Sequence, residues 1–442
     1  MISVILSTIL DVLIFLLSKL PDAFMGWGVG KVFDNLISTK FSKGKNQNIT
    51  LYSSECGNSG INLEQQRLLV STAFGNYFTG LLEKENIYLD IESQIDCPPI
   101  KGQEGVKPLQ RLYWLLSYPK GPRIFVFVGD GGMGKSTLSA KIVRCLFQEE
   151  SVDIILGDSA KTQHIDPASG EAVNYQPGYY DINSFYKKLC YQLGLPSLPK
   201  KQAIAAIKDR LVGQRAIIVV DNLESIEKGD ELLASLRSLM SRDVRAVVTT
   251  RETKKLRPLL ADLVVIQMKP ITSARDAKQF LDWHIEQYKA QNPTLLSLKQ
   301  QLSQRNLKWI IEKTGGIPLL LQLISSDVAR TSWEYTKGLP NVFGKELLEF
   351  LYQARWDDLG NQSVPGDTAK KLLNWIAAEQ YRGKSITTKK ISEWAKENSF
   401  SNSLDTALLL LHERFMVINR DVKKGNYSIF PSLAEFLERQ NL

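Results

Sequence analysis

The chain has 442 residues, of which 43% are hydrophobic and 23% are charged, so it is neither a low-complexity nor a disordered protein. This length allows roughly two to four domains with separate cores. The net charge of +8 is spread without a long Lys/Arg run, which favours an ordinary basic protein over a nucleic-acid or lipid binder. The four cysteines have no metal-ligand spacing and are expected to be reduced, and the scarcity of histidine argues against a His-based metal or catalytic centre.

The N-terminal segment, residues 1–37, is predicted to be hydrophobic and helical. Its first part, 1–20, just reaches the length of a membrane span and lacks the basic start of a secretory signal. Ser3, Ser7 and Asp11 are four residues apart, so they form a narrow polar stripe on a helix. Two interpretations stay open: a helix that enters the membrane with copies of itself, and a helix buried in an N-terminal domain.

Residues 38–99 are predicted to combine a linker with a helical segment. The beginning of this region is rich in Ser, Lys, Asn and Gly, as flexible linkers are. Apolar residues recur at helical spacing over 63–85, and 87–91 has the composition of a short strand. Pro98 and Pro99 then separate this region from the next domain.

A strand, a glycine-rich loop and a helix begin the next domain. The apolar run 124–128 leads directly into Gly129–Ser136, which matches the P-loop pattern G-x-x-x-x-G-K-[ST] in full. Such a loop directs backbone N–H groups at phosphate oxygens, and the helix N-terminus adds its positive dipole end. We expect Lys135 to reach the β- and γ-phosphates and the Ser136 hydroxyl to bind Mg²⁺. The predicted phosphate-binding residues are Gly129, Gly131, Gly132, Met133, Gly134, Lys135, Ser136 and Thr137.

A second apolar strand, 216–221, carries the candidate catalytic acid. It ends in Asp221, where a carboxylate is placed to hold Mg²⁺ together with Ser136. The next residue, Asn222, is not an acid, so Glu224 is the nearest carboxylate that could orient a water molecule. This arrangement predicts slow hydrolysis, which suits a timer better than a motor.

A third strand, 246–250, is followed by Arg251. Ligands of α/β sheets lie beyond the carboxyl ends of the strands, so Arg251 is expected to contact the γ-phosphate as a sensor or charge stabiliser; the alternative is an ordinary surface arginine. Further strands at 153–158 and 263–268 complete a predicted parallel sheet of about five strands. Residues 159–181 are expected to form a long polar loop, to which the sequence assigns no role.

Four motifs in this order resemble those of the STAND class of signal-transducing P-loop NTPases, in particular its NB-ARC and NACHT-like branch. They are GDGGMGKST (129–137), AIIVVDNLE (216–224), AVVTTR (246–251) and GGIPLLLQLI (315–324). The branch includes apoptosome ATPases, plant disease-resistance receptors and bacterial relatives. The resemblance implies an α/β P-loop NTPase domain at 100–268, a helical domain at 269–340 and a winged-helix domain at 341–442. It also implies ATP/ADP and Mg²⁺ as ligands, and a homo-oligomer on activation.

The resemblance adds two further expectations about single residues. In this family the proline of the Gly-x-Pro segment packs on the adenine, which implies Pro318, after Gly316, as the base contact. The alternative is a helix that simply begins after a Gly-Pro turn, and both can hold at once. A histidine that the family often uses to hold the β-phosphate of bound diphosphate corresponds here to Phe430. That departure implies a weaker hold on the diphosphate state.

Together these patterns predict an ATP-binding switch ATPase, with residues 1–20 as a membrane-acting effector in defence or cell-death signalling. The alternatives are a nucleotide-controlled DNA-binding regulator that uses the winged helix, and a membrane-anchored scaffold without toxicity. We expect a cytoplasmic protein that can associate with the inner face of the membrane. The family often carries C-terminal repeats that sense a ligand, whereas this sequence ends at Leu442, soon after the predicted winged helix. Three sources of the signal stay open: a separate sensor protein, the N-terminal region, and a direct trigger at the ATPase domain. Nucleic acid is the less favoured partner.

Overall fold

The computed structural model describes ten parts of the chain: residues 76–83, 88–97, 106–118, 121–167, 171–251, 263–339, 343–360, 363–415, 418–421 and 425–440. The chain divides into two compact units, and every described residue belongs to the second, Ser59–Pro99 with Gly105–Leu442. The predicted N-terminal segment, 1–37, lies outside the described residues. Within the described ranges, none of the helices is both long and apolar enough to span a membrane.

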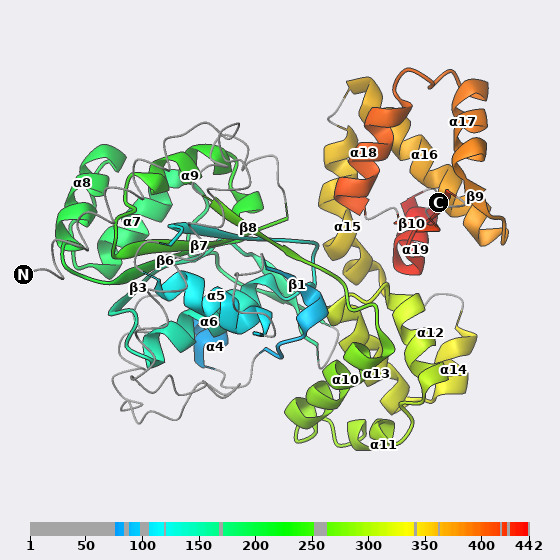
Figure 1. The fold of residues 1–442 in the computed structure, drawn as a ribbon, viewed down its shortest axis with the longest axis horizontal. Helices are drawn as coiled ribbons and strands as arrows, with labels where there is room; N and C mark the ends of the chain where they lie inside the picture. The colour runs from blue at the N-terminus through cyan, green and yellow to red at the C-terminus, as the bar shows by residue number, and fades with distance from the viewer. Residues whose placement is uncertain are drawn as a thin grey trace, which may run out of the picture. The chain divides into compact units, whose positions relative to one another are not determined.

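A six-stranded sheet with the order β1-β8-β2-β7-β6-β3 forms the centre of this unit (Figure 1). The parallel strands are β2 (Ile124–Val128), β3 (Ile154–Ser159), β6 (Ala216–Asp221), β7 (Val244–Thr250) and β8 (Leu263–Met268). These are the five strands expected from the apolar runs. The prediction of a purely parallel sheet is wrong at one edge, because β1 (Ile95–Asp96) pairs antiparallel with β8. The prediction of a short strand at 87–91 is wrong over the described residues 88–91, which form no strand. The strand β1 lies a few residues later, and two residues are too few to show a period in the sequence.

Both faces of the sheet are covered, and alternate residues of each strand enter different cores. Phe125 and Phe127 pack in the core with α4 (Asn76–Glu83), α5 (Pro108–Ser117) and α6 (Lys135–Gln148), whereas Val126 and Val128 belong to the other. That second core contains α7 (Ile182–Gln192), α8 (Lys200–Arg210) and α9 (Gly229–Arg237), on the opposite face in Figure 1. A strand buried on both faces reads as a continuous apolar run, which is why these strands were found from the sequence.

The connection between β3 and α7 contains a β-hairpin. Its strands are β4 (Gln163–Ile165) and β5 (Ala172–Asn174), which pair antiparallel. The sequence predicts only a long polar loop at 159–181. Three-residue strands with mixed polar composition carry no detectable alternation, so the hairpin is a product of its tertiary surroundings.

After the sheet, the described residues up to 385 form helices and no further strand. The first group is α10 (Ala274–Tyr288), α11 (Leu295–Lys299), α12 (Gln304–Thr314), α13 (Pro318–Arg330) and α14 (Trp333–Gly338). The second group is α15 (Lys345–Gly360), α16 (Ser363–Tyr381), α17 (Thr388–Glu397), α18 (Leu404–Phe415) and α19 (Pro431–Gln440). Among the second group lie the short strands β9 (Ile386–Thr387), β10 (Ile418–Asp421) and β11 (Asn426–Ser428), in the sheet order β10-β11-β9.

The cysteines depart from the expectation of reduced thiols at one position. Cys97 and Cys190 are buried and not bonded to another cysteine, and burial raises the pKa of both thiols. Cys145 is disulfide-bonded, which contradicts the expectation for that residue. No group of three His, Cys, Asp or Glu side chains suited to a metal ion occurs in the described parts of the chain.

A glutamine side chain protects the edge of the sheet at β3. Gln192 donates to the carbonyl oxygen of Gly157 and accepts from its N–H, each at 2.8 Å, as a neighbouring strand would. Edge strands with unpaired backbone groups invite pairing with other chains. Gly157 itself has φ +103, and a Cβ at this position would lie 1.9 Å from the carbonyl oxygen of Val219 on β6.

Because Gly157 lies so close to Val219, adding a single methyl group at this position should strongly destabilise the fold. Gly157→Ala should lower the free energy of unfolding by more than about 3 kcal/mol, because backbone strain adds to a clash with an oxygen that cannot move. Gly213→Ala is the control, since its φ is also positive, at +75, but nothing lies within 4 Å of the new Cβ. It should cost only about 1–2 kcal/mol. Urea denaturation of both variants measures the difference; equal losses would contradict the prediction.

Candidate functional site

The glycine-rich loop between β2 and α6 has the curled shape that phosphate binding requires. Gly132 and Gly134 have φ values of +75 and +86, a region that L-residues with side chains rarely adopt. Lys135 begins α6, and its side chain is 9% exposed. Its ammonium group donates to the carbonyl oxygens of Gly129 at 2.8 Å and Asp130 at 2.9 Å. The Lys135 side chain therefore lies along the glycine-rich loop, on the side where a bound phosphate is expected.

The Asp221 carboxylate is fully buried at the end of β6, where two hydroxyl groups hold it. Ser159 on β3 donates to Oδ2 and Thr249 on β7 donates to Oδ1, each at 2.6 Å. The Tyr179 hydroxyl donates to the backbone oxygen of Asp221 at 3.0 Å. Burial, helped by the charge of Asp221, raises the pKa of Tyr179 well above its usual value, so this phenol remains a neutral donor. The carboxylate is thus fixed between its two neighbouring strands.

Arg251 lies beside the phosphate loop, as its place after β7 predicts. A Cβ on Gly131 would lie 3.2 Å from the Arg251 guanidinium carbon. The guanidinium also forms an ion pair with Glu224, at 3.1 Å between Nε and Oε1, and the Arg251 backbone N–H donates to Oε2 at 3.1 Å. Because both groups are mostly buried, at 15% and 13% exposure, this pair is a strong restraint. The carboxylate expected to orient water is therefore held by the arginine expected to sense phosphate.

Arg251 makes a second set of contacts to α15. Its Nη1 donates to the backbone oxygen of Phe350 at 3.1 Å, and its Cζ lies 5.2 Å from the centre of the Phe350 ring. A cation over an aromatic face is stabilised by the ring quadrupole. One arginine thus connects the phosphate loop with a helix almost 100 residues later in the chain, which no sequence pattern indicated.

The Gly-Gly-Ile-Pro segment before α13 contacts the phosphate loop directly. The Leu319 N–H donates to the carbonyl oxygen of Gly132 at 3.1 Å. Pro318 occupies the first turn of α13 and lines the cavity, where the resemblance places the base contact. Gly316, at φ +74, pairs with the backbone of Ile271, and a Cβ there would lie 2.1 Å from the Ile271 oxygen.

Phe430, which stands where the family often has a phosphate-binding histidine, packs elsewhere. Its ring contacts Gly315, where a Cβ would lie 2.4 Å from the ring, and it is buried at 9% exposure. Phe430 is not among the residues that line the cavity. In this structure the position therefore joins α19 to the start of α13 and contributes no polar group to the site.

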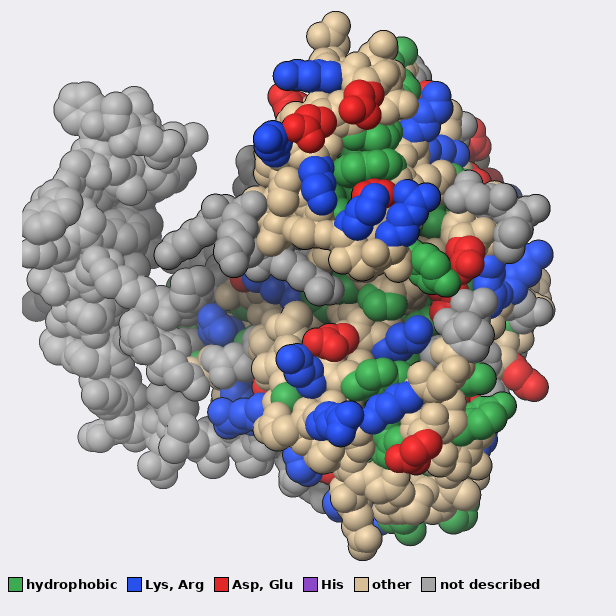
Figure 2. All heavy atoms as spheres, turned by 90° about the vertical axis from the view of Figure 1, so that its right-hand side faces the viewer, with side chains coloured by type: hydrophobic (Ala, Val, Ile, Leu, Met, Phe, Trp, Pro, Cys, Tyr) green, Lys and Arg blue, Asp and Glu red, His purple; other side chains and the backbone are tan. Residues whose placement is uncertain are grey.

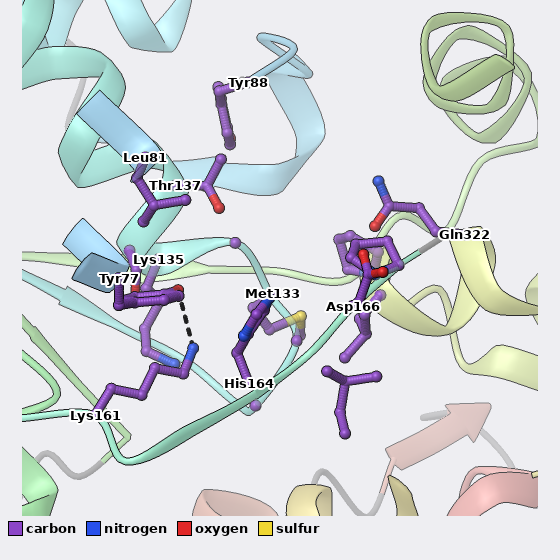
Figure 3. Close-up of a pocket in the computed structure, with 18 of the residues that line it drawn as sticks. Tyr77, Leu81, Tyr88, Met133, Lys135, Thr137, Lys161, His164, Asp166 and Gln322 are labelled. Carbon is purple, nitrogen blue, oxygen red and sulfur yellow. Dashed lines mark hydrogen bonds between the residues drawn. The ribbon is translucent and has the colours of Figure 1, made fainter. Parts of the chain in front are cut away.

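A cavity of about 630 Å³ brings most of the predicted residues together (Figure 3). This is within the range of small-molecule sites. The predicted residues that line it are Gly131, Gly132, Met133, Gly134, Lys135, Ser136, Thr137, Arg251 and Pro318. Gly129, Asp221 and Glu224 are not lining residues; Asp221 lies behind the hydroxyl of Thr249, which does line the cavity.

The cavity also contains residues that no motif indicated. Tyr88 and Gln94 lie before the phosphate loop in sequence, and the Gln94 amide donates to the carbonyl oxygen of Met133 at 2.9 Å. Lys161 comes from the β3–β4 connection, His164 from β4 and Trp283 from α10. A lysine after a strand or an aromatic residue on an amphipathic helix is common in any sequence, so only the fold selects these.

The arrangement fits a nucleoside phosphate with a divalent cation. Positive-φ glycines shape a backbone cradle that a Cβ would fill, and Lys135 supplies a cation within it. The oxygen donors Ser136 and Asp221 are of the type that Mg²⁺ prefers. The aromatic and amide side chains among the lining residues, such as Tyr88, Trp283 and Gln322, suit a base and its ring nitrogens.

Comparison with known proteins supports this class. Residues 119–260 match the family model of the AAA domain, which supports a P-loop NTPase domain in this part of the chain. No curated protein matches the sequence.

Several solved structures resemble the chain. A STAND protein with a tetratricopeptide repeat sensor from Pyrococcus horikoshii is 17% identical at a TM-score of 0.34, over 80% of this chain and 44% of that one. Cdc6p from Pyrobaculum aerophilum is 13% identical at a TM-score of 0.36, and the match covers 82% of this chain and 98% of that one. The Orc1 protein of Aeropyrum pernix, solved in complex with DNA, is 16% identical at a TM-score of 0.36, and the match covers 82% of this chain and 96% of that one. This chain therefore spans less than half of the STAND protein.

The hydroxyl groups of Ser159 and Thr249 both donate to the Asp221 carboxylate, so their removal should lower stability in a non-additive way. Thr249→Val keeps the side-chain shape but removes the donor to Oδ1 and the acceptor for the Asn222 N–H. It should lower the free energy of unfolding by about 1–3 kcal/mol, since a buried carboxylate loses a hydrogen bond. Ser159→Ala should act similarly at Oδ2.

Chemical denaturation of the parent, the two single variants and the double variant completes a double-mutant cycle that tests this prediction. Both hydroxyls serve one carboxylate, so the double variant should differ from the sum of the single losses by more than about 0.5 kcal/mol. Additive losses within that margin, or no loss from Thr249→Val, would show that the carboxylate does not depend on them.

Proposed function

We propose that this protein is an ATP-binding switch of the STAND type, which hydrolyses ATP slowly and oligomerises in its triphosphate form. The observation that carries this proposal is the convergence of the phosphate loop, Arg251 and the start of α13 on one cavity. A bound nucleotide would contact the sheet on one side and Pro318 and Leu319 on the other. The helices after the sheet can thus respond to the nucleotide, as a switch requires.

The residues of the site have separate roles in this proposal. The nucleotide supplies a phosphoanhydride bond whose cleavage resets the switch. Lys135 neutralises phosphate charge, and Ser136 with Asp221 holds Mg²⁺. Arg251 holds Glu224 in an ion pair, so this carboxylate can orient water only when the pair rearranges. That restraint supports slow turnover, in agreement with the absence of an acid at Asn222.

The C-terminal elements support the remaining domain assignments. We infer a helical domain at 269–340, which contains α10 to α14, and a winged-helix domain at 341–442, which contains α15 to α19 and in which β10 and β11 form the wing. Phe430 offers a phosphate no polar group, so we propose that the diphosphate state is held mainly by packing, including the contact of Phe430 with Gly315.

The alternative of a DNA-binding regulator has less support. On the face shown in Figure 2, Lys and Arg side chains alternate with acidic and uncharged ones rather than forming a continuous basic surface. Lys389 on α17 pairs with Glu393, and Lys371 on α16 pairs with Asp367 at 3.0 Å. Paired surface charges of this kind are typical of a solvated face.

The biological role that we propose is defence or cell-death signalling, with 1–20 as the membrane-acting effector. The apolar helix pattern with its polar stripe supports the effector assignment. A membrane-anchored scaffold without toxicity is the remaining alternative, and only the consequence of membrane contact separates the two.

The nucleotide site predicts different effects for two substitutions. Lys135→Ala should weaken binding of Mg²⁺-ATP by at least about 100-fold, because the phosphates lose a charge-assisted contact in a confined site. Asp221→Ala should keep measurable binding but lose Mg²⁺-dependent hydrolysis. Calorimetry and phosphate release measure the two effects. A parent protein without affinity for any Mg²⁺-nucleotide would contradict the proposed function, and unchanged turnover in Asp221→Ala would contradict that assignment.

The effector proposal predicts that deletion of 1–20 separates nucleotide binding from membrane damage. The shortened protein should bind ATP like the parent but fail to release dye from vesicles of bacterial lipids when a non-hydrolysable ATP analogue is added. Size analysis in the same mixture checks that the oligomer still forms. Dye release without 1–20 would rule out these residues as the effector, and release by neither protein would favour the scaffold.

A further inference from the structure

A third positively charged side chain, besides Lys135 and Arg251, lies at the phosphate end of the cavity. Lys161 is the second residue after β3, and two hydrogen bonds join its segment to Asp221 at the end of β6. The Ala160 N–H donates to the backbone oxygen of Asp221 at 3.0 Å, and the Lys161 N–H donates to the Ser159 hydroxyl at 3.2 Å. That hydroxyl in turn donates to the Asp221 carboxylate. Lys161 is therefore attached to the acid expected to hold the metal.

The ammonium group of Lys161 contacts aromatic residues and a phenol instead of a carboxylate. It donates to the Tyr77 hydroxyl at 3.0 Å and lies 4.5 Å from the centre of the Tyr77 ring, as Figure 3 shows. It also lies 6.0 Å from the centre of the Phe350 ring. Among the described residues, no acidic side chain forms an ion pair with Lys161.

The other two cations of the cavity have different partners. Lys135 donates to two carbonyl oxygens of the phosphate loop, and Arg251 is paired with Glu224. Arg251 thus brings a compensating negative charge into the site, while Lys161 does not. A bound triphosphate carries more negative charge than Mg²⁺ and Lys135 neutralise, and an ammonium group with three donors can bind an anion in place of a neutral hydroxyl.

We propose that Lys161 binds the terminal phosphate of a bound nucleoside triphosphate and gives up Tyr77 when it does so. This inference rests on the proposed nucleotide-binding function and names a phosphate-contacting residue that the P-loop pattern does not contain. Lys161 lies next to the strand ends that carry Asp221 and Thr249, where the γ-phosphate of a P-loop ligand is expected. A diphosphate ends short of that position and leaves Lys161 with Tyr77.

The exchange couples the cavity to α4. Tyr77 lies on α4, whose residues Phe78 and Leu82 are buried against α6. When Lys161 turns to phosphate, α4 loses one of its polar contacts to the sheet. Because coupling between two equilibria is reciprocal, loss of the α4 contact should also favour the triphosphate. Residues 1–75, which include the proposed effector, precede α4 in the sequence.

Lys161→Met and Tyr77→Phe in the full-length protein test the proposal by their opposite effects. Calorimetry with Mg²⁺-ADP and with a non-hydrolysable ATP analogue gives the ratio of the two affinities. Lys161→Met should weaken binding of the analogue about 10-fold or more, because a charge-assisted contact is lost. The same substitution should change the affinity for ADP less than about threefold. Tyr77→Phe removes the competing hydroxyl and should shift the ratio a few-fold toward the analogue. Lys208→Met, an exposed lysine on α8, is the control for the charge change.

Hydrogen exchange gives a second measurement that does not depend on affinity. Saturating analogue should speed exchange at Asn76–Glu83 in the parent and not in Lys161→Met, whereas ADP should have no such effect. If Lys161→Met keeps the parent's ratio, or weakens both nucleotides equally, Lys161 does not recognise the terminal phosphate. If the parent binds neither nucleotide, the proposed function fails as well, so the two failures are distinguishable. Thermal melting confirms that both variants are folded.

Discussion

The contact between the phosphate loop and the start of α13 is the constraint on which the rest of the site depends. The Gly132 carbonyl accepts a hydrogen bond from the Leu319 N–H, and any side chain at Gly132 would lie 2.8 Å from the Leu319 Cβ. The same positive φ that lets the loop bind phosphate therefore lets the helices approach. A loop that changes shape with its ligand must move this contact, and so nucleotide binding and the position of α13 are linked.

The charges of the site are arranged so that each cation has a replaceable partner. Lys135 contacts loop carbonyls, Arg251 contacts Glu224 and the Phe350 backbone, and Lys161 contacts Tyr77. Each partner belongs to a different element: the loop itself, the β6–α9 connection with α15, and α4. A phosphate that competes for these cations would loosen several elements at once, which is how a small ligand can act on a large structure.

Two features of the structure bear on the rate of hydrolysis and on how a nucleotide-bound state is held. Glu224 is restrained by Arg251, and no acid follows Asp221 directly, so efficient activation of water is disfavoured. Phe430 packs on Gly315 and offers no polar group to a phosphate. Both features agree with the slow turnover proposed above, and the packing of Phe430 on Gly315 joins the start of α19 to the turn between α12 and α13.

The amino-acid sequence by itself determined the phosphate loop, the five buried strands and the place of Arg251 beside that loop. These features are local: a glycine-rich turn between a strand and a helix, or an apolar run buried on both faces, has the same meaning wherever it occurs. Only the tertiary structure decided the antiparallel edge strand β1, the β4–β5 hairpin, the pairing of Glu224 with Arg251 and the presence of Lys161 and Tyr88 in the cavity. Those features arise from contacts between distant segments, and a single lysine, tyrosine or short polar segment does not reveal which distant residues it will meet.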